Sequence, residues 1–314
     1  MSGIPRLSIG LPVYNGERYL SEAIEALLGQ TYRDFELILS DNASTDGTPD
    51  ICRHYERLDD RVRFVRQPRN IGLSGNHNFV VDQSRGELFK WASYDDLYAR
   101  DLIERCVEAL DAQPNIVLAH SWTSVIDSDG QVIKVFEYPL GTSGPWAPGR
   151  FQSMLYDTGG DDIYGVVRSE VLRRVSPERS HHHADRTIVA ELSLHGPFHQ
   201  VPDWLYFRRD HPMQAERAHS SMRARCANMD PRRADQFKHP AARLAAEYLL
   251  GYVRAIQGAP LSSADRRQCY RTLAGWTLRR ARAGRLTVGG DPPVAEGVVV
   301  SVDEVVPGKE RITA

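Results

Sequence analysis

Short apolar runs alternate with amphipathic stretches through the first 120 residues. Leu7, Ile9 and Leu11 recur at every second position, which is typical of a strand, while Leu20 and Ile24 begin a stripe at helical spacing. The same reasoning predicts strands at 35–39, 62–65, 87–92 and 115–121, and helices at 48–58, 72–84 and 101–112. Strands that alternate with helices at this spacing indicate a parallel sheet with helices on its faces.

The pattern changes after residue 120. A hairpin around an Asp-Ser-Asp-Gly turn is predicted at 124–136, followed by a loop rich in proline and glycine at 139–149. Residues 212–239 are polar, rich in arginine and weakly periodic, so we expect a mobile loop there. The other predicted elements are a strand and a helix within 161–175, a helix at 184–196, an extended segment at 197–209, helices at 244–256 and 262–283, and a strand at 297–302.

Composition adds a charge asymmetry to this picture. The chain has 314 residues, of which 41% are hydrophobic and 25% are charged, as in an ordinary globular protein. That balance excludes a collagen, a disordered tail and a disulfide scaffold. The net charge of −2 conceals a net charge of −10 over residues 1–207 and of +11 over residues 208–285. An acidic body therefore precedes a basic C-terminal segment.

The cysteines and the N-terminal sequence indicate the cellular compartment of the protein. Cys52, Cys106, Cys226 and Cys269 are scattered, with no Cys-x-x-Cys pair, which favours a reducing compartment and argues against a zinc ribbon. The sequence begins without the features of a secretory signal, and no run approaches 18 apolar residues. We therefore expect a cytoplasmic protein, with a peripheral position at the inner face of the membrane left open.

Polar loops follow three of the predicted strands. Pro12-Val13-Tyr14-Asn15 follows the first, residues 41–48 follow the second, and Ser93-Tyr94-Asp95-Asp96 follows the fourth. In an open parallel sheet, ligands bind outside the carboxyl ends of the strands. Each loop alone is typical of an ordinary turn. Their convergence on one sheet edge predicts a ligand site there.

The early sequence resembles a known family. PVYNGERYLSEAIEALLGQTYRDFELILSDNASTDGT is similar to the opening of the inverting, nucleotide-sugar-dependent glycosyltransferases of family two, which have the GT-A fold. Asn70-Ile71-Gly72, Arg85-Gly86-Glu87 and Asp95-Asp96 continue that pattern. The resemblance is dense over residues 5–115 and loose over 160–211. It implies a Rossmann-like α/β fold with a mostly parallel sheet flanked by helices, here with a C-terminal helical appendage.

The resemblance also implies a donor site for a UDP- or dTDP-linked sugar. Asp41 would accept the imide N–H of the base, with Pro12 and Tyr14 shaping the base pocket and Glu17 near it. Asn70 and His77 would contact the nucleotide. The family often has an arginine near His77, which carries less charge at pH 7.

The acid pair suits a divalent cation, because hard cations prefer carboxylate and phosphate oxygens. We favour Asp96 as the ligand for Mg²⁺ or Mn²⁺ and place Asp95 near the ribose or donor sugar, although the two roles could be exchanged. His211 matches a family histidine that closes over the donor phosphates, and is a further candidate metal or phosphate contact. Ser93 or Tyr94 stands where the family often has another acid.

Inverting transfer also needs a base to take the proton of the acceptor hydroxyl. The resemblance implies Asp185, at the start of the predicted helix 184–196; the alternative is a carboxylate that only stabilises the helix terminus. We expect acceptor contacts from Trp146, Tyr164 and His183. The run His181-His182-His183 is a poor metal site, because consecutive histidines on an extended loop point in different directions.

The basic segment 208–285 has two interpretations. It forms solvated helix faces, or it is attracted to an anionic acceptor or membrane surface such as a lipid-linked phosphate. Nucleic acid is disfavoured, because basic and aromatic residues do not interleave. A saccharide, lipid-linked or small-molecule acceptor and a homodimer are also open.

These observations predict a metal-dependent inverting glycosyltransferase in three parts. Residues 1–120 bind the nucleotide sugar, 121–210 supply the acceptor site and base, and 211–314 form a mobile loop, a helical extension and a tail. Two alternatives stay open. A nucleotidyltransferase usually has a glycine-rich, cationic loop after its first strand, which Pro12-Val13-Tyr14-Asn15 lacks. The second is an inactive sugar-nucleotide-binding or scaffold protein, which would explain why the family's acid near Ser93 and its arginine near His77 are missing.

Overall fold

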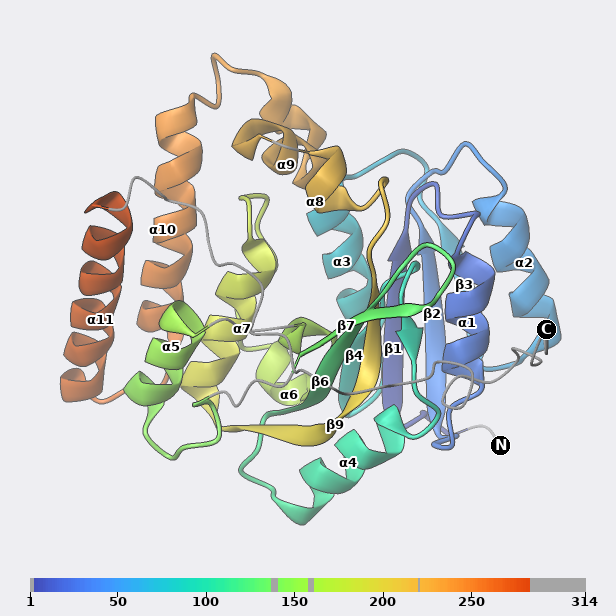
Figure 1. The fold of residues 1–314 in the computed structure, drawn as a ribbon, viewed down its shortest axis with the longest axis horizontal. Coiled ribbons are helices and arrows are strands. Elements are labelled where there is room, and N and C mark those ends of the chain that lie inside the picture. The colour runs from blue at the N-terminus through green and yellow to red at the C-terminus, as the bar shows by residue number, and fades with distance from the viewer. Residues whose placement is uncertain (1–2, 137–140, 158–160, 220, 283–314) are drawn as a thin grey trace.

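The computed structural model of the protein describes residues 3–136, 141–157, 161–219 and 221–282 (Figure 1). Over these residues one nine-stranded sheet runs through the molecule. Its first half is parallel, in the order β3 (Val62–Arg66), β2 (Phe35–Asp41), β1 (Leu7–Val13) and β4 (Leu88–Trp91). The predicted strands at 7–11, 35–39, 62–65 and 87–92 are thus confirmed.

The second half of the sheet is mixed. Strand β8 (Val166–Arg168) is antiparallel to both β4 and β6 (Leu118–Ile126), whereas β9 (Phe198–Arg209) is parallel to β6. Two short strands, β5 (Leu97–Tyr98) and β7 (Val132–Phe136), pair antiparallel with β9 and β6. The predicted α/β fold is confirmed, and the division at residue 121 stays a prediction. The expected fifth strand and the first arm of the hairpin form one continuous strand, β6, because its pairing with β9 spans both.

Helices cover both faces of the sheet. They are α1 (Leu20–Leu28), α2 (Thr48–Leu58), α3 (Leu73–Asp82), α4 (Leu102–Ala112), α5 (Ala147–Tyr156), α6 (Ser169–Leu172), α7 (Ala184–His195), α8 (Ala215–Ala218), α9 (Met222–Met229), α10 (Ala241–Gly258) and α11 (Ser263–Arg282). The expectation of a loop over 212–239 is wrong, because α8, α9 and a 3₁₀ turn at Pro231–Ala234 lie there. The strand expected at 297–302 lies outside the described residues.

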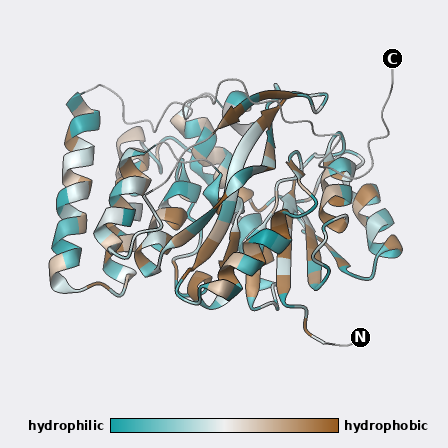
Figure 2. Ribbon diagram, turned by 60° about the horizontal axis from the view of Figure 1, so that its bottom comes forward, coloured by the Kyte–Doolittle hydropathy of each residue, from teal (hydrophilic) through white to brown (hydrophobic). Residues whose placement is uncertain are grey.

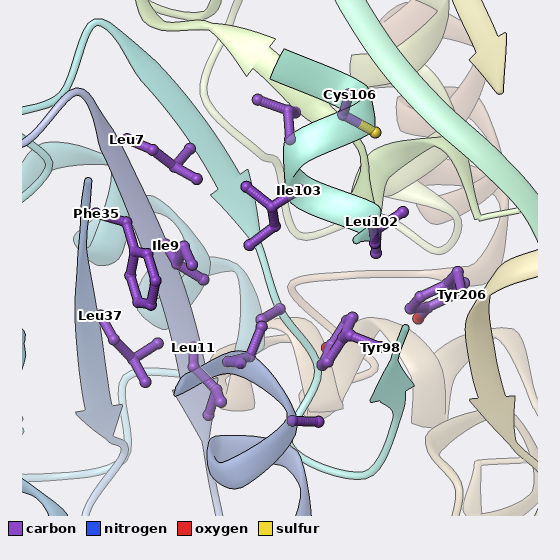
Figure 3. Close-up of a cluster of buried hydrophobic side chains, with 14 of the residues drawn as sticks. Leu7, Ile9, Leu11, Phe35, Leu37, Tyr98, Leu102, Ile103, Cys106 and Tyr206 are labelled. Atoms are coloured by element: carbon purple, nitrogen blue, oxygen red, sulfur yellow. The ribbon is translucent and has the colours of Figure 1, made fainter. Parts of the chain in front are cut away.

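Alternation along the strands produces two cores. Leu7, Ile9 and Leu11 of β1 pack with α1, α2 and α4 on one face (Figure 3). Gly10, between them, faces Val80 of α3 on the other side. That second core extends through α5 and α7 to α10 and α11, so the C-terminal helices share a core with the body. Figure 2 shows the resulting contrast between hydrophobic strands and the largely hydrophilic helix α11 at the left edge.

Gly72 couples the start of α3 to the C-terminal part of the chain. Its φ of +81° lies in the region that favours glycine, and an added Cβ would overlap the carbonyl oxygen of Met229, the last residue of α9. We expect Gly72→Ala to lower the free energy of unfolding by about 1–3 kcal/mol. Gly144→Ala is the matched control, because an added Cβ there meets nothing within 4 Å. Chemical denaturation measures both; equal stability of the two variants would contradict this account.

Candidate active site

The loops after β1 and β2 are joined by hydrogen bonds at the carboxyl edge of the sheet. The N–H of Asn15 donates to Ser44 Oγ (2.8 Å), and the N–H of Gly16 donates to Thr48 Oγ1 (2.8 Å). In return, the N–H of Thr45 donates to Asn15 Oδ1 (2.9 Å). Asn15 has a φ of +50°, an uncommon conformation that asparagine tolerates better than most residues. The two predicted strand-end loops therefore form one structure.

Asp41 lies at the base of this structure. Its side chain is fully buried; Oδ1 accepts the N–H of Ser44 (2.9 Å), and Oδ2 lies 3.2 Å from Arg66 Nε. Pro12 is buried within β1, whereas the Tyr14 side chain is exposed at the sheet edge. Glu17 Oε2 accepts the N–H of Gly47 (2.6 Å), so this carboxylate orders the second loop.

Asn70 and His77 have protein partners of their own. Asn70 Oδ1 accepts the N–H of Gly72 (2.8 Å), which shapes the turn into α3. His77 Nδ1 lies 3.0 Å from Glu178 Oε2, and its ring stacks against Trp91. His77 therefore anchors the segment before α7, and no phosphate contact is needed to explain its position.

The two acids of the pair face different partners. Asp96 accepts hydrogen bonds from the Tyr206 hydroxyl and from the N–H of Arg209 (2.8 Å), and both come from β9. Burial, and then the neighbouring charge of Asp95, raise the pKa of Asp96 well above its usual range. Asp95 Oδ2 instead lies 2.9 Å from His211 Nε2. The structure thus brings Asp95 and His211 together, whereas both carboxylate oxygens of Asp96 accept hydrogen bonds from β9.

Arg209 is a residue that the sequence analysis missed. It is 1% exposed, and its Nε donates to the carbonyl of Asp95 (2.8 Å). Its guanidinium also donates to Glu22 of α1 (2.8 Å) and to the carbonyl of Ser128 in the β6–β7 turn (3.1 Å). One buried cation therefore joins β9, α1, the hairpin and the acid loop. The sequence offers only its position two residues before His211 as a signal.

The donor set of Asp95 and His211 fits Mn²⁺ or Mg²⁺. A carboxylate oxygen and an imidazole nitrogen 2.9 Å apart can both reach one ion, and imidazole favours Mn²⁺ of the two. Within the described residues, no group of three or more His, Cys, Asp or Glu side chains is arranged to hold a metal. Two protein ligands suit an ion that completes its shell with phosphate oxygens and water.

Asp185 lies in the first turn of α7 with its side chain accessible to solvent. Surrounding protein atoms raise its pKa above the usual range by desolvation; the charge of Arg186 opposes this rise and that of Glu178 adds to it. A carboxylate with a raised pKa is a stronger base than one in bulk water. The predicted base is therefore accessible and has a raised pKa.

The turn Asp162–Tyr164 packs against α7, the helix that carries Asp185. The ring of Tyr164 stacks on Tyr206 at 5.3 Å. Burial raises the pKa of its hydroxyl well above the usual range, and the charges of Asp96, Asp95 and Asp185 act on it in the same direction. The carbonyl of Tyr164 accepts a hydrogen bond from buried Lys90. Tyr164 is thus within electrostatic reach of the acid pair and of Asp185.

The three consecutive histidines surround Tyr248 of α10. Their ring centroids lie 5.9, 4.6 and 6.0 Å from that of Tyr248, for His181, His182 and His183 in turn. Burial lowers the pKa of His182 and of His183 to about 4, so both are neutral at pH 7. They form an aromatic cluster that supports the start of α7; contact between His183 and an acceptor stays a prediction.

Trp146 joins the start of α5 to α11. Its indole N–H donates to Asp265 Oδ1 (3.1 Å) in the first turn of α11. Contact between Trp146 and an acceptor stays a prediction.

The α/β fold of this chain is similar to the GT-A fold of solved structures. One is S. aureus TarS, residues 1–349, in complex with UDP. The match covers 94% of this chain and 100% of the TarS chain, with a TM-score of 0.53 and 16% sequence identity. Another is the mannosyltransferase PcManGT of Pyrobaculum calidifontis, in complex with GDP-Man and Mn²⁺. This match covers 89% of this chain and 88% of the PcManGT chain, with a TM-score of 0.51 and 15% sequence identity. At these identities the likeness shows the fold.

The chain belongs to glycosyl transferase family 2, whose model matches residues 8–179. An uncharacterized glycosyltransferase of Haemophilus influenzae is 33% identical over 132 residues, 42% of this chain and 52% of that protein. An uncharacterized glycosyltransferase of Methanocaldococcus jannaschii is 30% identical over 135 residues, which cover 42% of this chain and 47% of that protein. The matched part thus spans about half the length of these curated relatives. Among the helices described, none is both long and apolar enough to cross a membrane.

Proposed function

We propose that this chain is an inverting glycosyltransferase that moves one sugar from a UDP- or dTDP-linked donor to an acceptor hydroxyl. The observation that carries the proposal is the pairing of Asp95 with His211 at the carboxyl edge of the sheet, in a chain whose Asp185 lies in the first turn of α7. We assign Asp95 to the leaving group and Asp185 to the acceptor. Family membership and the complexes of the two structural neighbours, one with UDP and the other with GDP-Man and Mn²⁺, support a nucleotide-sugar donor.

The donor would bind across the joined loops after β1 and β2. The exposed ring of Tyr14 offers a face for the base, and buried Asp41 offers a carboxylate at the strand end. Glu17 and Asn70 act on the loops themselves, through Gly47 and Gly72. We therefore assign Tyr14 and Asp41 to the base, and Glu17 and Asn70 to positioning.

Asp95 and His211 would hold the divalent ion, Mn²⁺ or Mg²⁺. When bound, the ion offsets the negative charge that develops on the nucleotide diphosphate as it leaves. This assignment exchanges the roles first expected for the acid pair, and it is favoured by the two hydrogen bonds that occupy Asp96. Asp96 and Arg209 then position the loop that carries Asp95.

Asp185 acts as the general base. As the acceptor oxygen attacks the anomeric carbon from the face opposite the nucleotide, Asp185 takes the hydroxyl proton, and the bond to the diphosphate oxygen breaks. One C–O bond forms as the other breaks, and because the attack comes from the face opposite the leaving group, the configuration of the sugar is inverted. The configuration of the released sugar therefore tests the proposal: an α-linked donor should yield a β product.

The rate of transfer should depend on the ionisation of Asp185. Only the carboxylate accepts a proton, so kcat should fall as the pH falls through a pKa raised above the ordinary aspartate range. In Arg186→Gln this acid limb should move to higher pH, because the arginine lowers the pKa of Asp185. A pH–rate profile measures both effects. An unchanged limb in the variant would argue against Asp185 as the titrating base.

A further inference from the structure

Helix α3 begins with residues that form helices poorly. The run Ser74-Gly75-Asn76-His77-Asn78 occupies its first turns. Serine and asparagine side chains compete for backbone hydrogen bonds, and glycine loses more conformational entropy on folding than any other residue, so this run disfavours a helix. Most helices in proteins are stabilised by tertiary contacts rather than by propensity. The contacts of these side chains therefore explain why the run is helical here.

Asn76 joins α3 to the end of β2. Its side chain is buried; Nδ2 donates to the carbonyl of Ser40 (2.8 Å), and Oδ1 accepts a hydrogen bond from the Ser40 hydroxyl (2.6 Å). Ser40 directly precedes Asp41. On the other side of Asp41, Asn42 Oδ1 accepts the N–H of Ile71 (2.8 Å), just before α3 begins. The carboxylate assigned to the donor base therefore lies between two residues that α3 and its preceding turn hold in place.

Asn78 joins α3 to the segment 176–179, which precedes α7. Its Nδ2 donates to the carbonyl of Glu178 (2.9 Å), and its Oδ1 accepts the N–H of the same residue (2.8 Å). One turn earlier in α3, Ser74 Oγ donates to the carbonyl of Arg179 (3.2 Å). Three hydrogen bonds from α3 thus hold the backbone of this segment.

The same segment is attached to α7, which carries Asp185. The N–H of Ser176 donates to Glu191 Oε1 (3.2 Å), on the third turn of α7. The carboxylate of Glu178 is buried, and its Oε2 lies 3.0 Å from His77 Nδ1 of α3. The charge of Glu178 also acts on Asp185 and raises its pKa. Helix α7 is therefore connected to α3 by direct contacts through this segment.

Asn76 and Asn78 lie on opposite sides of α3. Two residues along a helix correspond to a rotation of about 200°, so one amide faces the sheet and the other faces the segment 176–179. Figure 1 shows α3 between α7 and the parallel strands. Each amide uses its donor and its acceptor on a single residue, which fixes both the distance and the direction of the contact. The helix therefore spans from the donor side of the site to the base side.

We propose that α3 is a rigid spacer that sets the position of Asp185 relative to the bound donor, with Asn76 and Asn78 as its positioning residues. This inference rests on the proposed function and assigns two further residues to the same site. Asn76 acts through the end of β2, and Asn78 acts through the segment 176–179. Loss of either pair of hydrogen bonds lets one half of the site move against the other, and a displacement of about 1 Å can lower a rate about a hundredfold.

The test separates the two sides by the quantity that each controls. The full chain is incubated with a panel of α-linked UDP-sugars and Mn²⁺, with water as the acceptor. Sugar release gives kcat, and calorimetry gives the Kd for UDP. Asn78→Ala should lower kcat at least tenfold and leave the Kd within twofold. Asn76→Ala should weaken UDP binding about tenfold and change kcat less. Asn115→Ala, which removes an exposed amide, is the matched control.

A milder variant keeps the test decisive if Asn78→Ala does not fold. Ser74→Ala removes only the hydrogen bond to the Arg179 carbonyl, and should lower kcat about threefold without a change in Kd. A merely structural role predicts a lower Tm for these variants, with kcat and Kd of the folded protein unchanged. That result, or equal changes of kcat and Kd in the Asn76 and Asn78 variants, would overturn the proposal.

Asp185→Asn distinguishes failure of this inference from failure of the proposed function. If Asp185→Asn loses sugar release while Asn78→Ala keeps it, the spacer role of α3 is wrong and the proposed function stands. If Asp185→Asn releases sugar as fast as the wild-type protein, the base assignment fails, and the role of α3 fails with it.

Discussion

Replacing Asp185 with asparagine should lower kcat for sugar transfer by about a thousandfold. Asparagine keeps the size and shape of the side chain but cannot take a proton from the acceptor hydroxyl, and general base catalysis contributes about 10²–10⁴ to rate. The affinity for UDP should change little, because Asp185 is assigned to the acceptor and not to the loops after β1 and β2. Single-turnover transfer and calorimetry with UDP and Mn²⁺ measure the two quantities on the same sample.

Glu170→Gln is the matched control for this variant. Glu170 also lies in the first turn of a helix, α6, but its side chain is 69% exposed and pairs only with Arg174 at 3.8 Å. Its loss should cost no more than a few tenths to about 1 kcal/mol of stability and leave kcat unchanged. Full turnover by the Asp185→Asn variant would sink the base assignment.

Replacing Asp95 with asparagine should remove most of the metal dependence of UDP binding. Wild-type protein should bind UDP at least tenfold more tightly with Mn²⁺ than without it, since Asp95 and His211 would hold an ion that offsets the charge of the diphosphate. Asparagine keeps an oxygen for the Ser93 hydroxyl but lacks the charge that holds the ion. Calorimetry with UDP, with and without Mn²⁺, measures the difference, and His211→Ala should act in the same direction.

Asp96→Asn provides the contrast. Its two oxygens accept from Tyr206 and from the N–H of Arg209, so we expect a loss of about 1–3 kcal/mol in stability from a mismatched buried group. Thermal unfolding should therefore separate the two acids: Asp96→Asn lowers the Tm, and Asp95→Asn changes mainly metal-dependent binding. If Asp96→Asn alone removed the metal dependence, the two roles would have to be exchanged.

Much of the fold is evident in the sequence, because its strands and helices bury one regular stripe each. Leu7, Ile9 and Leu11 lie on one face of β1 as their spacing predicts. The strand-end loops meet at one edge, since parallel strands bring their carboxyl ends together. The family and the fold expected from the resemblance are confirmed.

The remaining features depend on contacts distant in sequence. Strand β6 runs through the expected boundary at residue 121 because its partner β9, 80 residues later, pairs along its whole length. Helix α5 has weak periodicity and a proline start, and the sequence analysis gave it no helix. Lys90 sits in an ordinary-looking strand, yet its ammonium is buried against Tyr98 and Tyr206, where burial lowers its pKa to about 8.

The candidate site residues also divide into those evident from the sequence and those that depend on distant contacts. Asp41, Asp95, Asp96 and Asp185 could be found because each follows a strand or begins a helix. The distinct environments of Asp95 and Asp96 could not, because they depend on which of the two faces β9 and which faces His211.

The most direct test of inverting, metal-assisted transfer is the first anomer released from an α-linked UDP-sugar. A panel of such donors is incubated with the protein and Mn²⁺, with water as the acceptor, and followed by proton NMR before the sugar mutarotates. We predict that the donor that is used yields the β anomer first, and that chelation of Mn²⁺ or Asp185→Asn suppresses its release. Release of the α anomer first would contradict inversion at this site.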